Sequence, residues 1–480
     1  MLSDYYLIFL ALLFALVGLQ RWRKTRFPLP PGPSGYPIVG NLFDMPSEHH
    51  WVKYLHWSKE YKSDIIYLRV LGRPIIVLNS YKAANDLLDA RSSLYSDSTM
   101  ATELLGWKSL TGFIPYGRLW YSRDLLRRLL ESPERFLHHV DHILAATIIS
   151  TSYGLDVEPE HDPNVERAER ALVQLKDAGI SGTFVVDILP LLRYMPSWMP
   201  GAGFKRYAER ARLDTVDMRE SPYQQGVRRL REGKGGQSIL SRRLAKGGYG
   251  IQGHPDEELI KDIAWVAYTG GAETSHLALS NFFAAMVLYP KVQKKGQEEL
   301  TGYLGSRLPA FEDLPHLPYV RAMMLELLRW QSVLPLGLPH RLTMDDEYNG
   351  YFLPKGSAVF VNIWALLRDE EIYPDPDTFD PERFLKNGEI NPDTLDPIPN
   401  FGFGRRICPG RFFAMDSLFI SIASILSCFD ITKVKDKEGR DIEPDIQWTS
   451  GFSRHIIPFE CSITPRSTES IKIIRDSELM

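Results

Sequence analysis

Cysteine is scarce in this 480-residue sequence, whose three cysteines are Cys408, Cys428 and Cys461. An odd and sparse set of cysteines excludes a framework of several disulfides and is typical of a reducing compartment. An excess of basic charge is absent as well, because 56 Lys and Arg residues face 60 Asp and Glu residues, for a net charge of -4. That balance excludes a general nucleic-acid-binding surface, and we expect no nucleic-acid partner.

A continuous apolar run covers Tyr5–Leu19, and a cluster of Arg and Lys follows it between positions 21 and 26. With its flanks, the run approaches the length of about 20 residues that spans a bilayer. A cleavable signal peptide would carry its positive charge before the apolar run, whereas here the basic cluster comes after it. We therefore expect a single-pass membrane anchor with the remainder of the chain in the cytosol; the alternative is a buried core helix.

The sequence divides into three parts. We expect a transmembrane anchor over residues 1–20, a basic and proline-rich linker over 21–46, and one large domain over 47–480. The prolines of the linker make it a stiff spacer between the anchor and the domain. Within the domain, the apolar segment 194–200 is either a second membrane contact or a packed connection.

The domain is expected to be mainly α-helical with a small β-rich subdomain. Hydrophobic residues make up 44% and charged residues 24% of the chain, which permits a sizeable core. Two β-rich runs, Ile65–Leu71 and Pro74–Leu78, are separated by a glycine-containing turn and predict a hairpin. A helical pattern over residues 255–289 is bounded by prolines and predicts one long helix.

A glycine-broken loop, Phe401–Gly410, contains Cys408 and leads into a helical pattern over Arg411–Ser427. The cysteine is therefore expected at a helix N-terminus, where the dipole and free N–H groups favour a thiolate. Glycines allow a flat, bulky group to approach the backbone, and Arg406 offers a cation for carboxylates. A thiolate in this setting suits an axial haem ligand, and the alternative is a buried structural cysteine.

The pattern Phe-Gly-x-Gly-x-Arg-x-Cys-x-Gly resembles the haem-binding signature of the cytochrome P450 family, the haem-thiolate monooxygenases. This resemblance implies the P450 fold and a bound heme b whose iron has Cys408 as its axial metal ligand. It also implies that electrons come from NADPH through NADPH–cytochrome P450 reductase, with cytochrome b5 as an optional further donor. The signature residues that would contact the cofactor are Phe401, Gly402, Arg406 and Gly410.

The middle of the long predicted helix carries two adjacent glycines, Gly270 and Gly271, which cost a helix interior about 2 kcal/mol relative to alanine. Small side chains on one face suit either contact with a flat ligand or a close helix–helix crossing. The stretch is similar to the family's oxygen-binding motif of a glycine followed by an acid and a threonine. The similarity implies that Gly271 contacts the cofactor, that Thr274 hydrogen-bonds the oxygen, and that Glu273 helps to deliver protons.

Further motifs of the family occur in the expected order. Glu326 and Arg329 lie three residues apart in a helical pattern, which alone would indicate a surface ion pair. The resemblance instead implies a buried structural triad with Arg383. It also places His340 as a donor to a haem propionate. The residues expected in the substrate pocket are Phe113, Tyr268, Leu336 and Phe452, which suggest an apolar or aromatic substrate.

One region departs from the family pattern. Trp120 resembles the start of a Trp-x-x-x-Arg motif that binds a haem propionate, but Asp124 occupies the arginine position and Arg123 comes one residue early. Comparison with the family suggests that roughly twenty to thirty residues are missing near positions 122–124. The expected consequence is the loss of one haem contact and of part of the surface where a reductase docks.

The sequence as a whole predicts a haem-dependent monooxygenase that inserts one atom of O₂ into an apolar organic substrate. It looks most like fungal secondary-metabolism members such as the O-methylsterigmatocystin oxidoreductase type, and endoplasmic-reticulum localisation is expected. Two alternatives stay open. One is a haem-deficient, inactive membrane-tethered protein, and the other is a haem-thiolate isomerase or dehydratase that needs no O₂.

Overall fold

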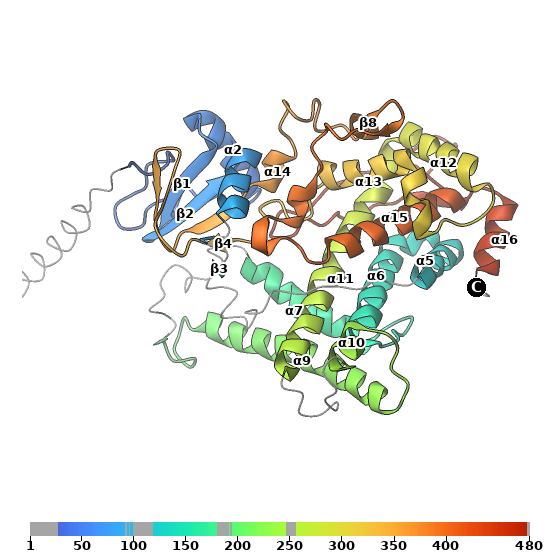
Figure 1. Cartoon of the computed structure of the whole chain (residues 1–480), viewed down its shortest axis with the longest axis horizontal. Coiled ribbons are helices and arrows are strands. Elements are labelled where there is room, and N and C mark those ends of the chain that lie inside the picture. Colours follow the sequence, from blue (N-terminus) through green and yellow to red (C-terminus); the bar gives the residue numbers. More distant parts are fainter. Residues whose placement is uncertain are drawn as a thin grey trace, which may run out of the picture.

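The computed structural model describes residues 27–91, 94–95, 97–98, 119–179, 192, 194–245 and 256–477. The predicted membrane anchor over residues 1–20 and the predicted pocket residue Phe113 lie outside the described residues. The described part is mainly helical with small sheets, as the sequence predicted (Figure 1). Its helices are α2 (His50–Tyr61), α3 (Tyr81–Ala84), α5 (Leu119–Glu131), α6 (Phe136–Tyr153), α7 (Pro163–Gly179), α9 (Gly203–Arg231), α10 (Ile239–Ala245), α11 (Glu257–Leu288), α12 (Pro290–Leu304), α13 (Pro318–Trp330), α14 (Ile363–Leu366), α15 (Arg411–Cys428) and α16 (Thr468–Asp476).

The largest sheet has the strand order β1-β2-β7-β4-β3. Its first two strands form the predicted hairpin, with a tight turn in which Leu71 and Gly72 both have positive φ, at 48° and 86°. Such a two-residue turn matches the right-handed twist of the strands. The strands are β1 (Ile65–Val70), β2 (Arg73–Leu78), β7 (Ala358–Val361), β4 (His340–Arg341) and β3 (Asp97–Ser98).

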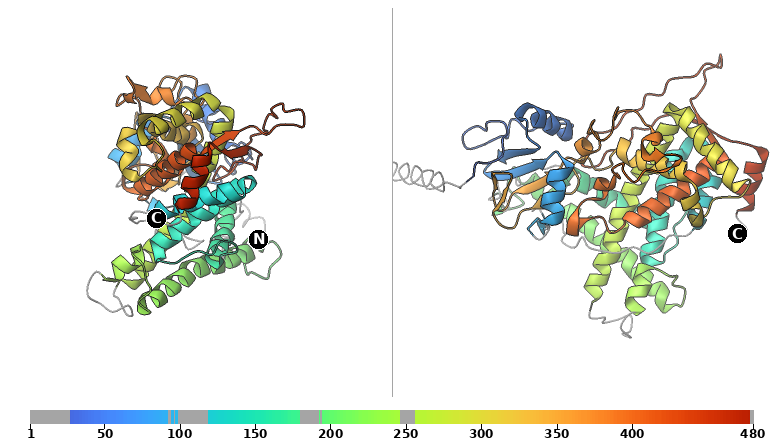
Figure 2. Two further views of the ribbon diagram at one scale, coloured as in Figure 1. Left: turned by 90° about the vertical axis from the view of Figure 1, so that its right-hand side faces the viewer. Right: turned by 45° about the horizontal axis from the view of Figure 1, so that its top comes forward.

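Strand β2 pairs in parallel with β7, so segments about 280 residues apart in sequence lie side by side at one end of the molecule (Figure 1). Three two-stranded sheets complete the strand content described. They are β10 (Phe429–Thr432) with β11 (Ser462–Pro465), β5 (Asp346–Tyr348) with β6 (Tyr351–Leu353), and β8 (Leu385–Lys386) with β9 (Glu389–Ile390). The strand-rich part and the α9–α10 region lie apart in both views of Figure 2.

Helix α11 runs through the helical part and contacts α6, α9, α10, α13 and α15. It is buried on most of its circumference, as expected of a helix that is apolar nearly all round. The main hydrophobic core lies between α5, α6, α11, α12, α13 and α15. Because α11 and α15 both border this core, residues on them are brought together from positions more than 100 apart.

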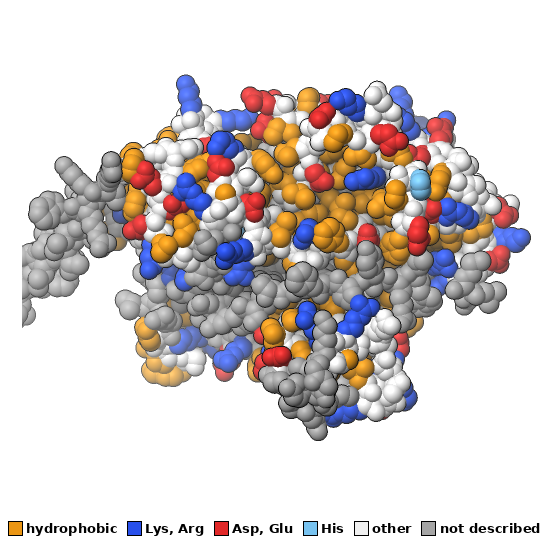
Figure 3. Space-filling model, viewed as in Figure 1, with side chains coloured by type: hydrophobic (Ala, Val, Ile, Leu, Met, Phe, Trp, Pro, Cys, Tyr) orange, Lys and Arg blue, Asp and Glu red, His pale blue; other side chains and the backbone are white. Residues whose placement is uncertain are grey.

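Helix α15 is long and apolar enough to cross a membrane, and among the described residues it is the one helix that meets this test. Its apolar stretch is 61% buried inside the protein, and its side chains belong to the main core. We therefore assign α15 to the core. On the face drawn in Figure 3, acidic and basic side chains are interspersed among the described residues, in keeping with the near balance of charge.

Candidate active site

Cys408 lies in a loop two residues before the N-cap of α15 and forms no disulfide. The loop folds back on itself, because the backbone N–H of Cys408 donates to the carbonyl of Phe401 over 2.6 Å. This return requires Gly402, whose φ of +81° strains any residue with a side chain. The predicted placement of the cysteine after a glycine turn and before a helix is therefore observed, and the cysteine is half-buried.

The protonation of Cys408 is set by two opposing effects. Burial raises the pKa of the Cys408 thiol, while the backbone N–H of Gly410 and the charge of Arg411 lower it. Burial is the larger effect, so the helix N-terminus by itself does not hold a thiolate here. A metal ion bound to the sulfur would displace the proton and supply the missing stabilisation.

Asn400 holds the cysteine loop against α13, a role that sequence analysis did not assign. Its side-chain amide donates to the carbonyl of Leu328 over 2.8 Å, and its side-chain oxygen accepts from the Ser332 hydroxyl over 2.8 Å. Two bonds in opposite directions fix both the position and the rotation of the amide. An asparagine one residue before the signature phenylalanine is the only sequence signal for this contact.

His340 and Arg406 lie close enough to interact electrostatically. His340 is buried on β4, and its Nδ1 donates to the carbonyl of Tyr95 over 2.7 Å. Burial lowers the pKa of His340, and the nearby guanidinium of Arg406 lowers it further. An imidazole and a guanidinium next to the cysteine loop form a suitable receptor for carboxylates, which would in turn favour a charged imidazole.

This donor set fits a haem group. Cys408 forms no disulfide and can bind the iron, and Gly402 leaves the backbone beside it without a side chain. Arg406 and His340 lie close together and can bind carboxylates. When bound, a thiolate-ligated haem supplies the activation of O₂. Cys408, Arg406 and His340 are the residues that would hold it.

The second predicted propionate site, formed by Trp120 with Arg123, stays a prediction. Helix α5 begins at Leu119 and runs without interruption through positions 122–124. Asp124, at the position where the family pattern has arginine, forms ion pairs with Arg127 and Arg128 of the same helix, at 3.3 and 2.8 Å. Trp120 lies in the first turn of α5, and Arg123 is half-buried on the same helix.

Two glycines in the middle of α11 have opposite surroundings. A Cβ on Gly271 would lie 2.8 Å from the side chain of Ile148 on α6, so this glycine serves a close helix crossing. A Cβ on Gly270 would meet nothing within 4 Å, and its carbonyl accepts a hydrogen bond of 2.7 Å from the Thr274 hydroxyl. The prediction that Gly271 contacts the cofactor is therefore corrected: Gly270 and Thr274 form the open face of α11.

Tyr268 is fully buried between helices and does not line a pocket in the described part of the chain. Its hydroxyl donates to the carbonyl of Asn164, and its ring packs edge-on against Tyr153. The pocket prediction for Tyr268 is wrong because α11 is buried on this side as well. Leu336 packs against the core beneath β1 and β2, and Phe452 is half-buried at a loop tip.

Glu273 is held by the loop that carries Phe452. Its Oε1 accepts from the Ser453 hydroxyl over 2.9 Å and lies 3.0 Å from Nε2 of His455. The loop is paired across its base by the bridge between Trp448 and Ile456. The predicted proton-delivery residue is thereby joined directly to the loop that carries the predicted pocket residue Phe452.

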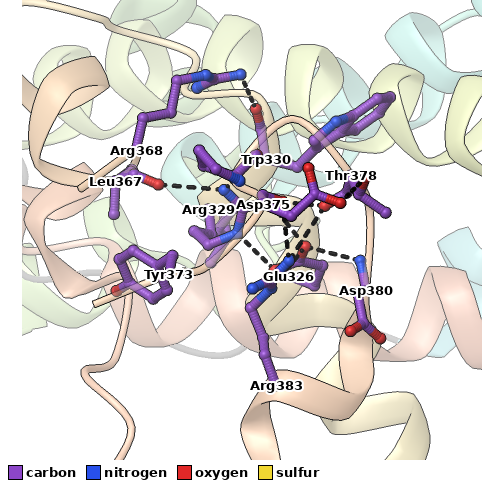
Figure 4. A network of polar contacts seen from close by, with 12 residues as sticks. Glu326, Arg329, Trp330, Leu367, Arg368, Tyr373, Asp375, Thr378, Asp380 and Arg383 are labelled. Atoms are coloured by element: carbon purple, nitrogen blue, oxygen red, sulfur yellow. Dashed lines mark hydrogen bonds and ion pairs between the residues drawn. The ribbon is translucent and has the colours of Figure 1, made fainter. Parts of the chain in front are cut away.

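The structure joins Glu326, Arg329 and Arg383 in one buried network (Figure 4). Arg329 donates twice to the Glu326 carboxylate, over 2.7 and 2.8 Å, and Nε of Arg383 reaches the same carboxylate over 3.2 Å. Arg329 also donates to three backbone carbonyls, those of Leu367, Pro376 and Thr378. The network thus ties α13 to the chain that leads towards the cysteine loop.

Comparison with known proteins shows the origin of this arrangement. The family model described as Cytochrome P450 matches residues 121–462. Cytochrome P450 monooxygenase ple1 of Rhodocybe pseudopiperita is 39% identical, with 96% of this chain and 95% of the relative covered. Cytochrome P450 monooxygenase 98 of Postia placenta is 41% identical, covering 95% and 94%, and the tryptamine 4-monooxygenase of Psilocybe cyanescens is 39% identical, covering 95% and 96%.

The alignments also show a difference in length. The alignment with ple1 spans 497 positions, but 96% of 480 residues is about 461, so about 36 positions have no residue in this chain. The family match begins at Tyr121, and the absence of residues near positions 122–124 stays a prediction. Fungal monooxygenases of this family use a haem iron with thiolate ligation and NADPH supplied through a reductase. The extent of these matches, together with the geometry around Cys408, shows that the chain belongs to the cytochrome P450 family.

Proposed function

We propose that this protein inserts one oxygen atom from O₂ into an apolar organic substrate in fungal secondary metabolism, with Cys408 as the axial ligand of its haem. The observation that carries the proposal is the single half-buried thiol beside a glycine turn, with Arg406 and His340 at hand for propionates. Thr274 on the open face of α11 and Glu273 beside it are assigned to oxygen binding and proton delivery.

The substrate is proposed to be apolar or aromatic. One relative is named as a tryptamine 4-monooxygenase, which makes an arylalkylamine a reasonable first compound to test. Phe452 at the tip of the docked loop and Phe113 are the assigned pocket residues.

The protein is proposed to be anchored in the endoplasmic-reticulum membrane by residues 1–20, with its domain in the cytosol and NADPH–cytochrome P450 reductase as partner. The charge order around Tyr5–Leu19 supports this orientation. Tyr194 and Trp198 support a second contact with the bilayer, because they expose 69% and 78% of their surface. Exposed aromatic side chains of this kind favour the membrane interface.

The test begins with the reduced, CO-bound absorption spectrum of the detergent-purified full chain. We expect the strongly red-shifted Soret band of thiolate ligation, followed by NADPH- and reductase-dependent oxidation of tryptamine or another aromatic probe. A spectrum of histidine-ligated haem, or no haem, would instead support the haem-deficient alternative. Product formation without NADPH and reductase would favour the isomerase or dehydratase alternative.

A further inference from the structure

The carboxylate of Glu273 receives two hydrogen bonds from one distant loop. The Ser453 hydroxyl donates to Oε1 over 2.9 Å, and Nε2 of His455 lies 3.0 Å from the same oxygen and 3.2 Å from the Ser453 hydroxyl. Because a carboxylate only accepts, the hydrogen of His455 must be on Nε2. The side chain of Glu273 is 13% exposed, so this contact is largely shielded from water.

Backbone contacts fix the loop in the position that this contact requires. Thr449 and His455 bond twice: the Thr449 N–H donates to the His455 carbonyl over 2.8 Å, and the His455 N–H donates to the Thr449 hydroxyl over 3.0 Å. Trp448 donates from its indole to the side chain of Asn281 on α11 over 2.8 Å. His455 is thus held towards Glu273 by the fold of its own loop, before any ligand binds.

A series of titratable groups leads from Glu273 outward. The ring of His276 on α11 lies 6.4 Å from the ring of His455, and its Nδ1 is 3.5 Å from the carboxylate of Asp141 on α6. The exposed fractions of the side chains are 25% for His455, 19% for His276 and 37% for Asp141. Glu273 is therefore the inner end of the series, and Asp141 is the end most open to solvent.

Arg454, the charged residue next to His455 in sequence, does not face the imidazole of His455. The neighbouring guanidinium of Arg454 donates to the side chain of Gln331 and lies 5.2 Å from the centre of the Trp448 ring. Among the described residues, the charged and titratable groups found to face His455 are Glu273 and His276, with Asp141 behind the latter.

From this geometry we infer that His455 is the positioning residue and proton donor of Glu273. Nδ1 of His455 first takes up one proton from solvent or from His276, and the resulting imidazolium passes its Nε2–H proton to Oε1 of Glu273, which leaves the ring neutral. No covalent bond other than N–H and O–H changes, and each proton that Glu273 delivers is replaced from outside. The inference rests on the proposed role of Glu273 in proton delivery.

The contact itself is tested without turnover. Diethyl pyrocarbonate modifies unprotonated imidazole nitrogens, and peptide mapping by mass spectrometry reports each histidine separately. In the variant Glu273→Ala, we expect His455 to react several-fold faster than in the wild type, relative to the exposed His138 on α6. An unchanged ratio of His455 to His138 modification would show that the contact is absent in solution and would overturn the inference.

The relay is tested with the variant His455→Gln, whose amide can still donate to Glu273 but cannot take up and pass on a proton. With fungal reductase, NADPH and 7-ethoxycoumarin as probe, we expect kcat to fall by on the order of 100-fold at unchanged KM. The share of NADPH recovered as H₂O₂ should rise, and so should the ratio of rates in H₂O and D₂O. If His455→Gln had the same kcat and the same solvent isotope effect as the wild type, His455 would only hold the carboxylate in place. That result would refute the inference.

Trp448→Phe is the matched control, because it removes one hydrogen bond between the same loop and α11 but leaves the titratable series intact. We expect its solvent isotope effect to equal that of the wild type. If it reproduced the effects of His455→Gln, loop docking would explain both variants and the relay would be refuted. A wild type that forms no product with any probe would contradict the proposed function, whereas the modification result would still decide the contact.

Discussion

The buried carboxylate of Glu326 offers the sharpest test of how the fold is held together. Its partners are Arg329, over 2.7 and 2.8 Å, Arg383 over 3.2 Å, and the backbone N–H of Asp380 over 2.8 Å. The side chains of Glu326 and Arg329 have no exposed surface, and that of Arg383 is 9% exposed. The variant Glu326→Gln keeps the size of the side chain and removes its charge.

The size of the expected stability loss follows from the charges of Arg329 and Arg383, which stay buried when the carboxylate is removed. Two unit charges about 4 Å apart interact by about 4 kcal/mol at an effective dielectric constant of 20. Breaking a buried pair by removing one partner costs about 3–5 kcal/mol, because the other charge stays buried without compensation. The amide of glutamine also directs an N–H group at donors that already point inward. We therefore expect the free energy of unfolding to fall by about 3–5 kcal/mol.

Urea unfolding followed by circular dichroism measures the loss, and the reduced CO-bound spectrum reports whether thiolate ligation survives. The exposed pair between Lys295 and Glu382, whose side chains are 52% and 51% exposed, provides the control. Lys295→Gln should cost no more than about 1 kcal/mol. If Glu326→Gln lost no more than this control, the network would not be the clamp that its geometry implies.

Three further predictions concern the haem site and α11. Cys408→Ala should lose the spectrum of thiolate-ligated haem, and a variant with an unchanged spectrum would refute the assignment of the ligand. Thr274→Ala should raise H₂O₂ release per NADPH consumed, since its hydroxyl lies on the open face of α11; unchanged coupling would make it a packing residue only. Gly271→Val should cost about 1–3 kcal/mol by overpacking against Ile148, whereas Gly270→Ala should gain about 1 kcal/mol of helix propensity, both read from urea unfolding. Equal effects at the two glycines would refute the close crossing with α6.

Local patterns of the sequence predicted the elements well. The hairpin of β1 and β2 follows from a glycine turn between β-rich runs, and α11 falls within the prolines that bound its pattern. These features depend on neighbours in sequence, so periodicity and turn chemistry suffice. The same holds for Cys408, whose glycines and following helix fix the local backbone.

Contacts between segments that are distant in sequence could not be predicted from these local patterns. Helical spacing put Gly271 on a face of small residues, but it does not specify which neighbouring helix covers that face, and α6 does. The pocket prediction for Tyr268 failed for the same reason. In a helix that is apolar on all sides, the sequence does not distinguish the side that packs against other helices from the side that is open. His455 lies three residues after the predicted pocket residue Phe452 and meets Glu273 across 182 positions, a pairing that only the fold defines.

The predicted shortening near positions 122–124 would affect the haem site and the fold to different extents. Helix α5 continues through positions 122–124 and buries Leu125, Leu126 and Leu129 against α6 and α15, so the helical core closes around this junction. The cysteine loop is held separately, through Asn400 and α13. Missing residues at the junction would therefore weaken haem retention and reductase docking more than they weaken the fold. Because the helical core and the cysteine loop are held by separate contacts, we expect the chain to resist urea unfolding but to bind haem weakly.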